Sequence, residues 1–141
     1  MMKPVRVVLA TAVLVALFMF AGSQVAFAGS PHFVSANATR SGNTLTVSGK
    51  EAGLGNETQV HIVLNATAQC INGGGKHPKA VNKENVSAAG DFPVQNGQAT
   101  FTLTVTATFK PDCSPPMSVV FTNVTLTDAA HNVTAKIPGT F

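Results

Sequence analysis

The sequence of 141 residues contains no tryptophan and no tyrosine, and charged residues make up only 11% of it. Without these two aromatic residues, sugar binding by ring stacking has little support. The sequence also lacks the G-x-S-x-G motif of serine hydrolases and any pair of carboxylates within one loop. Its four histidines are scattered without metal-ligand spacing. We therefore expect a protein with no catalytic residues, no metal site and no cofactor.

Residues 1–28 have the three parts of a secretory signal peptide. Lys3 and Arg6 give a basic start, 7–21 is an apolar run, and 26–28 reads Ala-Phe-Ala, which offers small residues to a signal peptidase. The apolar run is shorter than the roughly 20 residues that a spanning helix needs. The sequence therefore predicts cleavage after residue 28, a secreted, extracellular bacterial protein, and no membrane span in its mature form.

The mature domain, 29–141, is nearly neutral. Lys3 and Arg6 leave with the signal peptide, so seven of the nine basic residues remain against six acidic ones. Because nucleic-acid binding depends on basic groups that neutralise phosphates, we expect no nucleic-acid partner. The chain has two cysteines, Cys70 and Cys113. In an exported protein they are expected to pair as a structural disulfide.

Apolar and polar residues alternate along the mature domain, as is typical of half-buried strands. In 100–109 five threonines alternate with apolar residues, and in 59–70 the alternation points Cys70 toward the core. Other strands are expected at 33–40, 44–48, 85–88, 118–127 and 133–137. Turns are expected at 41–43, 95–98 and 128–132, the last of which contains Asp128 and His131. The pattern predicts an all-β fold, an antiparallel immunoglobulin-like β-sandwich of about seven strands.

Two local features refine this prediction. The apolar phase of 118–127 slips between Phe121 and Val124, which indicates a bulge. The threonines of 100–109 form a ladder of the kind found on ice-binding surfaces, although one strand is not an array and sheets twist. The β-propensity of threonine explains the ladder without a function. Four further threonines would extend the ladder if their strands were neighbours, namely Thr44, Thr46, Thr125 and Thr127.

The stretch CINGGGKHPKAVNKEN, 70–85, is the most basic part of the second half of the chain. A phosphate-binding loop needs a hydroxyl residue and a helix after its lysine, and neither follows Lys76. Loops at the ends of sandwiches often recognise partners. We predict that the 72–84 loop of a monomeric binding module contacts an anionic glycan, a wall polymer or an acidic protein, although its lysines could simply keep a long loop soluble. The expected contacts are Lys76, His77, Lys79 and Lys83.

Two resemblances add expectations. The segments SGNTLTVSG, KEAGLG and NGGGKHPKAVNKE resemble a group of small secreted bacterial proteins of unassigned function, which implies export and the fold. The segments NGQATFTLTV and LTDAAHN are similar to the neocarzinostatin-type apoproteins, which carry enediyne chromophores in a secreted immunoglobulin-like sandwich. That family has two disulfides, whereas this chain can form one. The second resemblance implies an alternative function, a small-molecule carrier with a cleft at one end of the sandwich.

Overall fold

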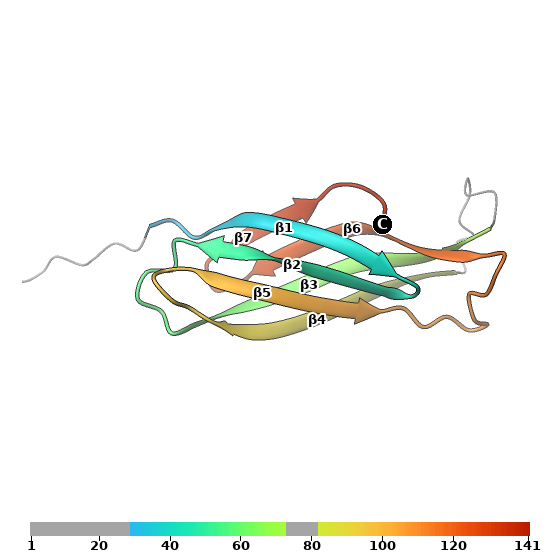
Figure 1. The fold of residues 1–141 in the computed structure, drawn as a ribbon, viewed down its shortest axis with the longest axis horizontal. Helices are drawn as coiled ribbons and strands as arrows, with labels where there is room; N and C mark the ends of the chain where they lie inside the picture. Colours follow the sequence, from blue (N-terminus) through green and yellow to red (C-terminus); the bar gives the residue numbers. More distant parts are fainter. Residues whose placement is uncertain (1–28, 73–81) are drawn as a thin grey trace, which may run out of the picture.

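The computed structural model describes residues 29–72 and 82–141, which form two packed antiparallel sheets (Figure 1). The strands in chain order are β1 (His32–Ser41), β2 (Thr44–Ala52), β3 (Gln59–Ile71), β4 (Lys83–Pro93), β5 (Ala99–Thr106), β6 (Ser118–Asp128) and β7 (Val133–Ile137). One sheet has the order β1-β2-β5 and the other β4-β3-β6-β7. The predicted immunoglobulin-like sandwich is confirmed, since the second and fifth strands pair in one sheet and the third and sixth in the other. Within the described ranges there is no helix of the length and hydrophobicity needed to cross a membrane.

β2 and β4 are several residues longer than the sequence pattern predicted, whereas β5 ends at Thr106, short of the predicted 109. β4 begins at Lys83, opposite Gln69 of β3, and continues to Pro93, opposite Gln59. Its middle is rich in serine, alanine and glycine, which have weak strand preference, so pairing with β3 decides its extent. β2 likewise runs beyond the predicted 44–48 to Ala52.

The predicted bulge in β6 is confirmed. Thr67 of β3 lies opposite Thr122, and Asn65 lies opposite Thr125, so β6 has one more residue than β3 across this interval. Asn123 takes up the extra length with φ of 51°. Because the bulge shifts the phase by one residue, the buried side chains on either side of it all face the core.

The core lies between the two sheets and is built from the inward residues of the alternating strands. In β5, Phe101, Leu103 and Val105 are buried while the threonines between them are exposed. The ring of Phe33 packs edge-on against Phe101, with ring centroids 5.8 Å apart. Burial of each large apolar side chain contributes about 1.5–3 kcal/mol. The largest fully buried apolar residues are Phe101, Phe121, Leu45, Leu54, Ile62, Leu64 and Leu126.

The threonine ladder of β5 continues onto one neighbouring strand. Thr44 and Thr46 of β2 lie opposite Thr106 and Thr104, with Oγ1–Oγ1 distances of 3.2 Å and 3.4 Å. The other two threonines of the sequence prediction lie on β6, which belongs to the other sheet. The outer face of β2 and β5 thus carries cross-strand hydroxyl pairs, which stabilise the pairing of the two strands.

The predicted disulfide is also confirmed. Cys70, near the end of β3, is bonded to Cys113 in the connection between β5 and β6, with the two Cα atoms 5.8 Å apart. A disulfide in a small β-domain fits an extracellular protein. The bridge ties the β5–β6 connection to the central strand of the four-stranded sheet.

Candidate functional site

Three connections gather at the end of the sandwich opposite the β1–β2 turn, on the left in Figure 1. They are the β2–β3 loop (53–58), the β4–β5 turn (94–98) and the β6–β7 turn (129–132). The β4–β5 turn is the one predicted from its Asn-Gly pair, and Asn96 and Gly97 have φ of 54° and 74°. The N–H of Leu54 donates to the carbonyl of Gly97 at 2.9 Å and joins the first two connections.

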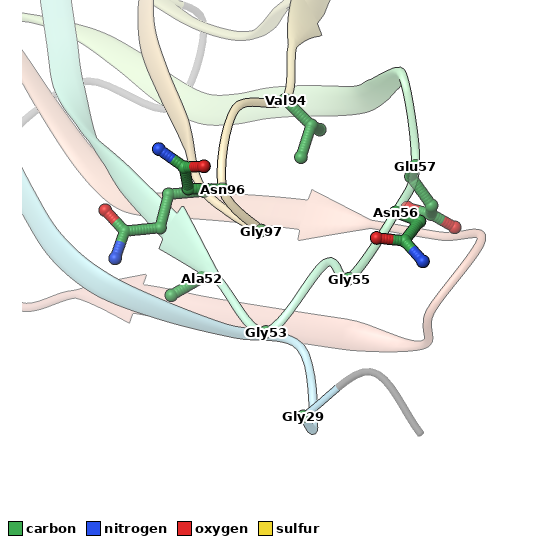
Figure 2. A pocket seen from close by; sticks show the side chains of 10 residues that line it. Gly29, Ala52, Gly53, Gly55, Asn56, Glu57, Val94, Asn96 and Gly97 are labelled. Atoms are coloured by element: carbon green, nitrogen blue, oxygen red, sulfur yellow. The ribbon is translucent and has the colours of Figure 1, made fainter. Parts of the chain in front are cut away.

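A pocket of about 590 Å³ opens between the β2–β3 loop and the β4–β5 turn (Figure 2). Its lining includes four glycines, three amide side chains and one carboxylate, with Val94 between the two connections. Among the described residues that line it there is no lysine or arginine. The pocket therefore offers backbone groups, amides and a single negative charge. The polar side chains are Asn56, Glu57, Asn96 and Gln98.

Gly53 holds the start of the domain against this pocket. Its φ is +78°, and a Cβ atom at this position would lie 2.2 Å from the carbonyl oxygen of Ser30. Only glycine accepts both this backbone conformation and such a close approach. The segment that begins at Gly29 therefore runs directly over Gly53, and Gly29 lines the pocket.

Two carboxylates lie in the core beside the pocket. Glu51 and Asp128 are the charged side chains that are fully buried in the described part of the chain, each with 0% exposure. Glu51 follows Leu45 and Val47 in the inward phase of β2, and Asp128 follows Leu126 in the inward phase of β6. β2 and β6 belong to different sheets, and both side chains point into the core between them. The two carboxylates therefore come close together, with ligand atoms within 4.8 Å of each other.

His131 links this buried pair to the pocket. Its Nδ1 lies 2.5 Å from Oδ2 of Asp128, and its backbone N–H donates to Oδ1 of the same residue at 3.3 Å. Its Nε2 lies 2.8 Å from Oε1 of Glu57, which lines the pocket. Burial alone would lower the pKa of His131, but the hydrogen bonds with Asp128 and Glu57 outweigh burial and raise it. The ring therefore favours the imidazolium form, which donates from both nitrogens.

Glu51 has an unusual environment. No donor group reaches either of its carboxyl oxygens. Burial, and after it a hydrogen bond with Asp128 and the charge of that carboxylate, raise the pKa of Glu51 to about 8, so the protonated carboxyl donates to Asp128. One ligand atom from each of Glu51, Asp128 and His131 lies within 4.8 Å of the others, so these residues could hold a metal ion.

The residues predicted to form the binding site are only partly covered by the structure. Lys76, His77 and Lys79 lie outside the described residues. Lys83 is the exposed first residue of β4 and belongs to the strand rather than to a loop. It pairs with Gln69 near the disulfide, at the other end of the sandwich from the pocket.

The sequence pattern did not predict the cluster of Glu51, Glu57, Asp128 and His131. It placed Asp128 and His131 in a turn; His131 lies in the β6–β7 turn and its N–H donates to Oδ1 of Asp128, whereas Asp128 is the last residue of β6. It did not foresee that Asp128 faces inward, or that Glu51 reaches it from the other sheet. One feature of the sequence could have predicted that these two carboxylates are buried. Glu51 and Asp128 are charged residues at positions where the alternation of their strands calls for an apolar side chain.

Comparisons of the chain with protein-family models, with curated proteins and with solved structures gave no match. Both resemblances drawn from the sequence stay predictions. Function must therefore be inferred from the side chains and surfaces described above.

Proposed function

We propose that this protein is a secreted, monomeric, non-catalytic binding module that carries a small polar molecule in the pocket between the β2–β3 loop and the β4–β5 turn. The pocket itself is the observation that supports this function. Its volume of about 590 Å³ falls within the roughly 300–1,000 Å³ of small-molecule sites. It lies at one end of the sandwich, where the resemblance to the apoproteins implied a cleft.

The lining favours a neutral ligand rich in hydroxyl or amide groups, because His131 and the α-amino group that cleavage would place on Gly29 offset the charge of Glu57. The amides of Asn56, Asn96 and Gln98 can each donate and accept hydrogen bonds, and Glu57 accepts them. Glycines at the rim leave backbone groups open to a ligand. An aromatic chromophore would need a more apolar surface than this pocket offers.

Secretion fits the disulfide and the predicted signal peptide. Cleavage after residue 28 would leave the new α-amino group on Gly29, which lines the pocket. Processing would then complete the rim of the site. Protein collected from the culture medium is therefore the proper material for a ligand search.

Filling the pocket is expected to remove the ligand. We expect native mass spectrometry of the wild-type protein from medium to show a small-molecule adduct on a chain that begins at Gly29. Asn56→Trp places a large side chain at the pocket and should lose the adduct. Asn37→Trp, at an exposed position on the outer face of β1, makes the same change away from the pocket and should keep it. Absence of an adduct from the wild type, or its persistence in Asn56→Trp, would contradict the carrier function.

The second candidate function is the predicted contact between the 72–84 stretch and an anionic partner such as an envelope glycan, a wall polymer or an acidic protein. The support is the way in which both strands flanking this stretch are held. Cys70 of β3 is fixed by its disulfide, and Oε1 of Glu84 in β4 accepts the backbone N–H of Thr108 at 2.7 Å. Lys83 is exposed beside these two anchors.

Removing the positive charges tests this candidate. The triple variant K76A/K79A/K83A is expected to lose retention on extracted cell envelope, because each lysine removed weakens the attraction to anionic groups. Wild-type retention should also fall with added salt, since salt screens exposed charges. The matched variant K50A/K110A/K136A has the same net charge and should stay bound. Equal retention of the two variants would rule out a specific role for the 72–84 lysines.

A further inference from the structure

We propose that Glu51, Asp128 and His131, with Glu57 beside them, form a binding site for one divalent ion of the zinc class. The site lies next to the pocket but is separate from the lining amides, and the proposal does not depend on carriage of a small molecule. It rests on the placement of three side chains from β2, β6 and the β6–β7 turn.

The first argument is that the carboxyl of Glu51 has no donor group near it. This side chain is fully buried, and no donor reaches either of its oxygens, so an ionised Glu51 would be unpaired. Buried polar atoms nearly always have a partner in folded proteins, because an unpaired one costs about 1–3 kcal/mol or more. The carboxyl is within reach of Asp128 and His131, two side chains that also bind metals. An ion among the three would supply the missing partner.

The second argument is the spacing of the ligand atoms. In a tetrahedral zinc site the ligands lie about 2.0–2.1 Å from the ion, which places them about 3.3 Å from one another. Here the ligand atoms of the three residues lie no more than 4.8 Å apart, and Nδ1 of His131 lies 2.5 Å from Oδ2 of Asp128. The spacing that zinc requires lies between these two distances. Small side-chain rotations would therefore bring the ligand atoms to the positions of a zinc site.

The third argument is the type of donor. Zinc accepts imidazole nitrogen together with carboxylate oxygen and is satisfied by four ligands. Calcium takes six to eight oxygens, more than these few side chains supply. Oε1 of Glu57 lies 2.8 Å from Nε2 of His131, the ring nitrogen on the other side from Asp128, so Glu57 would orient the ring and a water would take the fourth position.

The ligands are held by regular structure. Glu51 and Asp128 belong to paired strands, and the backbone N–H of His131 is bound to Asp128. Ligands on strands keep their geometry better than ligands on free loops. By contrast, His61 and Asp91 form a pair at 2.7 Å whose side chains are 54% and 55% exposed. That surface pair offers two ligands instead of three and provides a matched control.

Zinc titration of the full secreted protein, first stripped with a chelator, tests the proposal. With zinc chloride as the probe and a chromophoric chelator as competitor, we expect one equivalent to bind to the wild type. Glu51→Gln and His131→Gln should each weaken binding by about 100-fold or more, because each removes a direct ligand. His61→Gln should stay within about threefold of the wild type. Zinc should raise the melting temperature of the wild type and of His61→Gln, but not that of Glu51→Gln.

The proposal is overturned if the wild type binds no zinc, if both cluster variants bind like the wild type, or if His61→Gln alone abolishes binding. It is also overturned if calcium chloride competes as well as zinc chloride. Should Glu51→Gln fail to fold, His131→Gln decides, because that side chain is 21% exposed and its loss disturbs the core less. Asn56→Trp separates the two proposals, since it fills the pocket and should leave zinc affinity unchanged.

Discussion

Opening the Cys70–Cys113 disulfide is expected to lower the free energy of unfolding by about 4 kcal/mol. The two cysteines are separated by 43 positions, so the bridge removes the closure entropy of a long loop from the unfolded chain. A domain of this size has a limited core, and its total stability is of the order of 5–15 kcal/mol. Loss of the bridge would therefore remove a large part of the stability but leave the strands paired.

Urea unfolding of the oxidised and reduced wild type measures this effect. The reduced protein should unfold at lower urea and with a larger m value, because an unbridged chain exposes more surface on unfolding. The variant C70A/C113S should behave like the reduced protein, which separates the loss of the bridge from any effect of the reductant. Alanine suits position 70 because Cys70 is buried at 3% exposure and a hydroxyl there would lack a partner. Coincident midpoints for the oxidised and reduced forms would refute the estimate.

The sequence predicted a strand correctly wherever buried and exposed residues alternate along it. In 100–109 the threonines and apolar residues alternate, and β5 shows the same alternation between exposed and buried positions. The phase slip after Phe121 predicted the bulge for the same reason, because a strand must turn its apolar residues back to the core. The extent of β4 was harder to predict, since its alanines and glycine carry little preference of their own.

The cluster beside the pocket could not be assembled from local pattern alone. Extending the inward phase of Leu45 and Val47 along β2 reaches Glu51, so the sequence did contain the clue that this carboxyl faces the core. It contained no clue that Asp128 would face Glu51, because that depends on how two separate sheets pack. Glu57 and His131 meet only because the β2–β3 loop and the β6–β7 turn lie at the same end.

With a chelator present, the protein is expected to become less stable as the pH rises from about 5 to about 8. The pKa of Glu51 is about 8 in the folded protein and 4.5 ordinarily, so between these values the folded state holds a proton that the unfolded state has released. Stability falls with pH wherever the folded state binds more protons. His131 acts in the same direction: its raised pKa stabilises the fold below its ordinary value of 6.5, and this contribution is lost as pH rises through the folded value.

Glu51→Gln isolates the larger of these two contributions. At about 1.4 kcal/mol per pH unit, the interval between 4.5 and about 8 corresponds to at most about 5 kcal/mol of stability lost by the wild type. Glutamine cannot ionise, so the variant should show a much flatter profile in urea unfolding between pH 5 and 8.5 and should be the more stable protein at pH 8.5. Asp112→Asn makes the matching acid-to-amide change in an exposed carboxyl outside the cluster and leaves the Glu51 titration in place. Parallel profiles for the wild type and Glu51→Gln would show that Glu51 is ionised in the folded protein across this range, and that the end of the core tolerates its charge.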